Sequence, residues 1–136
     1  MNINIPPAKK FDTKALLSTL WLVVMLNMLK ADILSLFIPG AAEEVARTAA
    51  SAGASIPQLM LVGAVMGQIG IAMIVLSRVL KDSLNRWINI LAAIITLAYI
   101  WGGMASYPHY LFIASIETLC LILIIGFAWK WHNVEA

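Results

Sequence analysis

Four apolar stretches, each long enough to cross a lipid bilayer, occupy most of this 136-residue chain. A helix rises about 1.5 Å per residue, so roughly 20 residues cross the ~30 Å hydrocarbon layer. The stretches that reach this length are residues 15–38, 56–80, 84–107 and 110–129. The sequence therefore predicts an all-α integral membrane protein, with residues 1–136 forming one domain of four transmembrane helices.

The composition excludes an ordinary soluble domain. Hydrophobic residues make up 62% of the chain and charged residues 12%, whereas soluble domains carry about 25% charged residues. A small soluble domain would have to expose too much of this apolar surface to water. We therefore expect membrane lipid as the first partner and no nucleic acid, because the net charge of +2 comes from residues near the membrane edges.

The distribution of basic residues predicts the topology. Arg47 is the one basic residue of the 39–55 loop, and the other flanking basic residues share the opposite side: Lys9, Lys10, Lys14, Arg78, Lys81, Arg86 and Lys130. By the positive-inside rule, both termini are cytoplasmic in a bacterial inner membrane. The short connections at 81–83 and 108–109 make neighbouring helices antiparallel. The first apolar stretch lacks a small-residue cleavage site, so we interpret it as an uncleaved helix.

The 39–55 loop lies outside in this topology and is rich in alanine. We expect a short surface helix here, with Glu43 and Arg47 spaced for an i, i+4 pair. Ser55 is the expected N-cap of the second span, and Pro57 falls in its first turn.

Polar residues inside the spans carry the functional signal. A charge facing lipid there costs ~2.5–3.5 kcal/mol, so these groups should face the bundle interior. All four helices contribute residues between about 10 and 18 Å below the outer boundary: Asn27, Lys30, Asp32, Gln68, Thr96, Tyr99 and Glu117.

Helical phase divides these residues among faces. Lys30 and Asp32 point in nearly opposite directions, so only one of them can face a given pocket, whereas Asn27 shares the face of Lys30. Two helix faces are candidates for the interior: Asn85, Asn89, Ala92, Thr96, Tyr99 and Gly103 on the third helix, and Ile113, Glu117, Cys120, Leu121 and Ile124 on the fourth. Two interpretations stay open, a polar ligand chamber around Glu117 and a structural ion pair between Lys30 and Glu117.

The second helix carries a stripe of small residues. Gly63, Gly67 and Gly70 lie on one narrow face and include a GxxxG spacing, which allows a neighbouring backbone to approach closely. We expect this stripe to pack helices within the bundle or between the protomers of a homo-oligomer.

Several kinds of chemistry find no support in the sequence. Cys120 is the single cysteine, so neither a disulfide nor a redox pair can form within the chain. His109 and His132 fall on opposite sides of the membrane and cannot share one metal ion. No catalytic, metal or cofactor motif stands out, and we expect a protein that is not an enzyme.

The chain resembles a family of uncharacterised bacterial four-helix membrane proteins. The resemblance covers nearly all four helices, and it implies no assigned activity. Gln68 stands where that family's pattern has an acid, and Lys30 where it has an aromatic residue. The organisation is also similar to that of DoxX-type proteins. The matching positions are Asn27, Asp32, Ser77, Arg78, Asn85, Arg86, Trp87, Asn89 and Glu117.

These observations favour a protein that binds a small amphipathic or lipid-like ligand in an outer-half polar pocket. A proton-coupled exporter acting as a homodimer is the first alternative. A structural accessory subunit of a membrane complex is the second. An enzyme of the sterol-isomerase kind is the weakest, because only Asp32 and Glu117 could supply its carboxylates.

Overall fold

A computed structural model of the chain describes residues 3–4, 11–103 and 107–134, with side chains up to Trp131. Four of its helices are long and apolar enough to span a membrane. A fifth, shorter helix follows the first of these four in the chain. In chain order the helices are α1 (Thr13–Ser35), α2 (Ala41–Ser51), α3 (Ile56–Val79), α4 (Asp82–Gly102) and α5 (Pro108–Val134).

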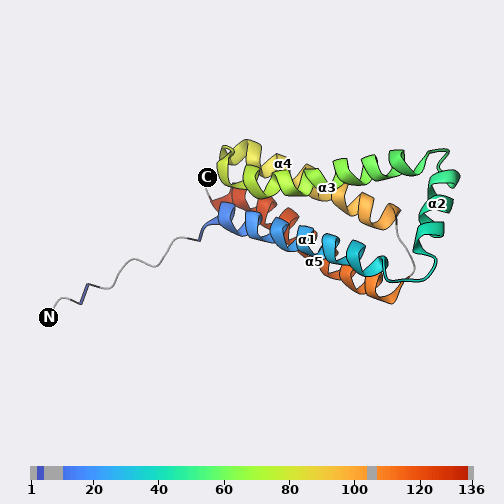
Figure 1. The fold of residues 1–136 in the computed structure, drawn as a ribbon. Coiled ribbons are helices and arrows are strands. Elements are labelled where there is room, and N and C mark those ends of the chain that lie inside the picture. The colour runs from blue at the N-terminus through green and yellow to red at the C-terminus, as the bar shows by residue number, and fades with distance from the viewer. Residues whose placement is uncertain (1–2, 5–10, 104–106, 135–136) are drawn as a thin grey trace.

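The four long helices form an antiparallel bundle (Figure 1). α1 packs against α3 and α5, and α4 packs against the same two helices from the other side. α1 begins and α5 ends at one end of the bundle, which we call the termini end. α2 lies across the opposite end, which we call the α2 end. The predicted all-α membrane bundle is confirmed.

Local sequence sets where the helices begin and end. Ser55 accepts a hydrogen bond from the backbone of Gln58, whose side chain bonds back to Ser55, so α3 starts with a capping box. α4 ends at Gly102, earlier than the predicted residue 107, because two consecutive glycines weaken the helix there. Residues 104–106 of that prediction lie outside the described residues. α5 begins at Pro108, since the fixed φ of proline suits a first helical position.

The connection from α1 to α3 contains the expected surface helix. α1 ends at Ser35 rather than Ile38, and the next three backbone N–H groups each bond to the carbonyl three residues back, a tightening common at helix ends. The expected ion pair between Glu43 and Arg47 is absent from the described residues. Glu44 of α2 instead accepts a hydrogen bond from Tyr107.

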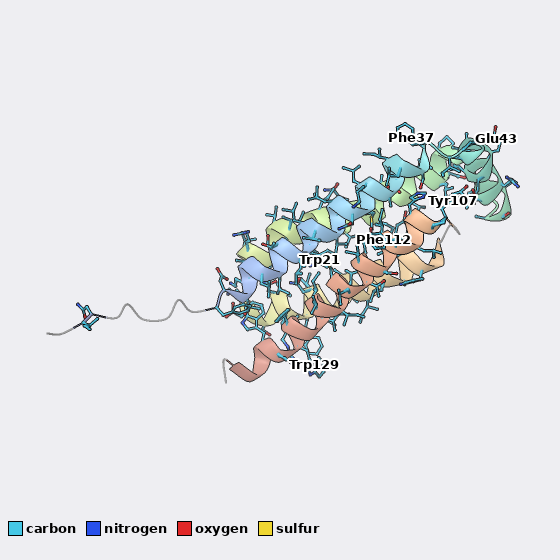
Figure 2. All side chains as sticks on the ribbon, turned by 90° about the horizontal axis from the view of Figure 1, so that it is seen from below. Trp21, Phe37, Glu43, Tyr107, Phe112 and Trp129 are labelled. Atoms are coloured by element: carbon cyan, nitrogen blue, oxygen red, sulfur yellow. The ribbon has the colours of Figure 1, made fainter. Side chains whose placement is uncertain are left out.

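The apolar core lies toward the termini end and the middle of the bundle. Its fully buried side chains include Leu17 and Trp21 of α1, Leu121 and Ile124 of α5. Trp21 lies among the helices, whereas Trp129 projects from the surface (Figure 2). Trp21 is therefore a core residue of the bundle.

A buried polar network joins three helices at the termini end. The indole N–H of Trp21 donates to Asn89 Oδ1 at 2.8 Å, and the Ser77 hydroxyl donates to the same oxygen at 3.2 Å. Asn89 Nδ2 donates to Asn85 Oδ1 at 2.6 Å, while Asn85 Nδ2 donates to the Ser77 carbonyl at 2.7 Å. These amides are fully buried, and each has its polar atoms paired, as an apolar surrounding requires.

Basic side chains connect the helices to one another at the termini end. Arg78 Nε donates to the Ser18 hydroxyl at 3.0 Å, and Arg86 Nε donates to the Ala128 carbonyl at 3.1 Å. Lys14 forms an ion pair with Asp82 at 3.1 Å. Each contact joins two helices, so these residues fasten α1 to α3, α4 to α5 and α1 to α4. Lys9 and Lys10 lie outside the described residues.

The three glycines of α3 differ in their surroundings. Gly70 is buried against Met25 of α1, whose sulfur would clash with a β-carbon at this position. At Gly63, an added β-carbon would lie 3.4 Å from the Tyr99 hydroxyl of α4, and at Gly67 it would meet nothing within 4 Å. Gly70 therefore marks the close approach of α1 and α3, while Gly63 makes room for a side chain.

We expect the Asn89→Leu variant to be less stable by roughly 1–3 kcal/mol, because the buried donors of Trp21 and Ser77 would lose their acceptor. Unfolding in mixed detergent micelles, followed by the tryptophan fluorescence of the chain, to which buried Trp21 contributes, measures this change. Thr19→Ala is the matched control, since the exposed Thr19 hydroxyl bonds only within its own helix. Equal stability of the two variants would contradict a structural role for the network.

Candidate functional site

Glu117 is the one buried carboxylate among the described residues. Its side chain lies on α5 and is 3% exposed. The same helix face buries Ile113, Cys120, Leu121 and Ile124, so an acid interrupts an otherwise apolar stripe. The predicted interior face of this helix is therefore the face that the bundle buries.

The Glu117 carboxyl group accepts no hydrogen bond from, and forms no ion pair with, any residue that the structure describes. Its Oε1 atom is buried and accepts no hydrogen bond within the part of the chain that the structure describes. Buried polar atoms in native proteins nearly always have a hydrogen-bond partner. Where one lacks a partner in the protein, a ligand, a water molecule or a bound proton can account for it. The contrast with the fully paired asparagines at the termini end makes Glu117 the centre of the candidate site.

Asp32 of α1 is the second carboxylate of the site. It is exposed, yet it lies within electrostatic range of Glu117 and of the hydroxyl groups of Tyr99 and Tyr110. Of the two residues left open by helical phase, Asp32 is the one that lies within electrostatic range of Glu117.

Two tyrosines complete the constellation. Tyr99 is half-buried on α4, and its hydroxyl lies over Gly63 of α3. Tyr110 is half-buried on α5, seven residues before Glu117 and therefore on the same helix face. Tyr110 is not among the site residues predicted from the sequence, although its i, i+7 spacing from Glu117 is a signal that could have identified it.

Lys30 does not belong to this group. The residue is exposed, and it forms no ion pair with Glu117 among the described residues. The interpretation that Lys30 and Glu117 form a structural ion pair is therefore wrong. The reason is geometric, since Lys30 is two residues from Asp32 and points away from the face that meets α5. On an exposed face, a lysine stem can carry its ammonium group toward the membrane surface.

Gln68 does not belong to the group of residues around Glu117 either. It is exposed on α3 and makes no hydrogen bond among the described residues. The close contact of Gly70 with Met25 fixes the rotation of α3, and Gln68, two residues earlier, points to the opposite side.

Asn27 and Thr96 use their polar groups locally. Asn27 Nδ2 donates to the Val23 carbonyl at 2.9 Å, and the Thr96 hydroxyl donates to the Ala92 carbonyl at 2.8 Å. Both bonds lie within one helix. Within the described ranges, neither residue donates a hydrogen bond to Glu117 or to another helix.

A polar rim, formed by Ser35, Glu44, Tyr107 and His109, lies at the α2 end. Tyr107 donates to Glu44 and stacks on His109, with ring centroids 5.7 Å apart and planes at 10°. His109 Nε2 lies 3.2 Å from the Ser35 hydroxyl. The rim links α1, α2 and α5, and it was not predictable from the sequence because its members are far apart in the chain.

A shallow, open depression of about 470 Å³ lies on α2 and is lined by Glu44, Arg47, Thr48 and Ser51. Its lining includes none of the residues around Glu117. No group of three potential metal ligands comes together within the described residues.

Residues 8–136 match the model of a family of unknown function, DUF6326. The match spans nearly the whole chain, so the protein belongs to this family. The predicted membership of a family without an assigned activity is thus confirmed. No curated protein and no solved structure matches the chain, and the DoxX-like organisation stays a prediction.

The rim predicts a pH-dependent attachment of α2. The hydrogen bond to Glu44, with smaller effects of burial and of the Glu44 charge, raises the pKa of Tyr107 above its ordinary value of 10.0, and Arg47 opposes this shift. A raised folded-state pKa means that the stabilisation is complete below about pH 10 and is lost as pH rises through the folded-state pKa.

We therefore expect Glu44→Gln to lower the pKa of Tyr107. The measurement is a tyrosinate absorbance titration, in which the Tyr107→Phe spectrum is subtracted to isolate this residue. Glu43→Gln, on the same helix, is the control and should leave the titration unchanged. A Tyr107 titration that is identical in the wild type and in Glu44→Gln would contradict the contact.

Proposed function

We propose that this protein binds a small amphipathic or lipid-like molecule, and that the polar end of this ligand engages Glu117. The observation that carries the proposal is the buried Oε1 atom of Glu117, which has no partner among the described residues. A ligand with a hydrogen-bond donor would supply the missing partner. Ligand sites between the helices of a bundle are common, and they use a few convergent polar groups in an apolar surrounding.

The proposed location is a bacterial inner membrane with both termini in the cytoplasm. Lys14, Arg78, Arg86 and Lys130 lie at the termini end, as the positive-inside rule requires for its cytoplasmic side. In this orientation α2 and the rim face outward, and Glu117 lies in the outer half of the membrane. The ligand would therefore come from the outer leaflet or from the space beyond it.

Thermal unfolding of the purified protein in detergent tests ligand binding. We expect some single-chain amphiphiles or lipid fractions to raise Tm saturably, because a ligand at about 100 times its Kd stabilises the folded state by ~2.7 kcal/mol. The shift should be lost in Glu117→Gln and kept in Glu43→Gln, whose exposed position on α2 lies outside the site. An unchanged melting curve across the panel would argue against binding.

A proton-coupled exporter acting as a homodimer is the second candidate function. It is favoured by two carboxylates, Asp32 and Glu117, that lie within electrostatic range of each other near the α2 end. Two neighbouring acids can exchange a proton for a substrate. If this function holds, adding a bound amphiphile to weakly buffered protein should release protons, and Glu117→Gln should abolish the release. Binding without proton release would leave simple ligand binding as the function.

A further inference from the structure

The two carboxylates of the site, Glu117 and Asp32, lack a counter-charge among the described residues. Asp32 and Glu117 are close enough to interact, and no basic side chain forms an ion pair with either of them among the described residues. Lys30, the nearest cation in sequence, is exposed and lies on another face. Arg78 and Arg86 are engaged at the termini end. In an apolar surrounding, a carboxylate without a counter-charge favours the arrival of a cation.

Two tyrosines lie near these carboxylates. Tyr99 and Tyr110 both lie within electrostatic range of Asp32, and Tyr110 also lies within range of Glu117. The face of an aromatic ring attracts organic cations, and this attraction strengthens when water is excluded. Neither tyrosine hydroxyl has a hydrogen-bond partner among the described residues, so both can also bond to a polar head.

The two carboxylates differ in their access to lipid. Asp32 is exposed on the bundle surface, whereas Glu117 is buried. Around this level, the exposed surface of α1 and α5 is apolar, with Leu29, Ile33 and Phe112 all more than 45% exposed. A molecule with an alkyl chain can therefore keep its chain against this surface while its head passes Asp32 to reach Glu117.

We infer that the ligand is an amphiphile with a monovalent cationic head, such as a protonated alkylamine or alkylguanidine, held between Glu117, Asp32 and the two tyrosines. This inference rests on the proposed function and specifies its ligand class. Glu117 supplies the buried counter-charge and Asp32 attracts the head at the surface. Gly63 leaves room for the Tyr99 hydroxyl beside it.

The experiment uses four amphiphiles of equal chain length with the full-length protein in dodecylmaltoside. Decylammonium and decylguanidinium are the cationic probes, decanol is the neutral probe and decanoate is the anionic probe. The readouts are Tm and the Kd from isothermal titration. We expect both cations to bind at least tenfold more tightly than decanol and decanoate.

Substitutions inside and outside the proposed site test where decylammonium binds. Glu117→Gln should weaken decylammonium binding by about 100-fold, because it removes the buried counter-charge. Asp32→Asn should weaken the same binding by about tenfold, as expected for a partly exposed charge. Glu117→Asp keeps the charge and should keep the preference for cations. Glu43→Gln is the control outside the site, and it should bind decylammonium like the wild type.

The outcomes separate this inference from the proposed function. Equal binding of decanol, decanoate and decylammonium, lost in Glu117→Gln, would overturn the cationic class and leave ligand binding intact. Absence of saturable binding by all probes and lipid fractions would overturn both. If Glu117→Gln does not fold, as judged by size-exclusion chromatography, Asp32→Asn decides the result. Unchanged decylammonium binding in Asp32→Asn would then overturn the inference.

Discussion

The hydrogen bond from the Trp21 indole to Asn89, in a setting without water, is the contact on which the bundle depends. Asn89 also receives the Ser77 hydroxyl and donates to Asn85, so one amide fixes α1, α3 and α4 at the same height. Apolar side chains alone specify helix association weakly in lipid, because the surrounding acyl chains are equally apolar. Complete pairing of these few polar atoms therefore sets which helix faces meet.

The polar groups near the two ends of the bundle differ in their hydrogen bonding. At the termini end, asparagine amides, serine hydroxyls and arginine side chains all have partners in the protein. Nearer the α2 end, the buried Oε1 atom of Glu117 has no partner in the part of the chain that the structure describes. Native folds tend to break such local rules at functional positions. This difference, more than the presence of an acid in a span, separates the half of the molecule whose polar side chains join the helices from the half in which we propose that a ligand binds.

Much of the fold was predictable from the sequence, whereas the partners of each polar residue were not. Length and hydropathy located four helices, and helical phase identified the buried faces that carry Asn89, Thr96 and Glu117. Phase shows which residues share a face, but it does not show which neighbour that face meets. The choice of Asp32 over Lys30 and the outward position of Gln68 follow from helix rotations, which are set by long-range contacts such as Gly70 with Met25.

The position of α2 determines how the bundle can deform. Its backbone is continuous with α1 and α3, and the Tyr107 hydroxyl ties it to the segment just before α5. At the far end, several independent bonds fasten the helices in pairs. Any spreading of the long helices will therefore pivot about the termini end and widen toward α2, where the contacts of Tyr107 with Glu44 and of His109 with Ser35 restrain it.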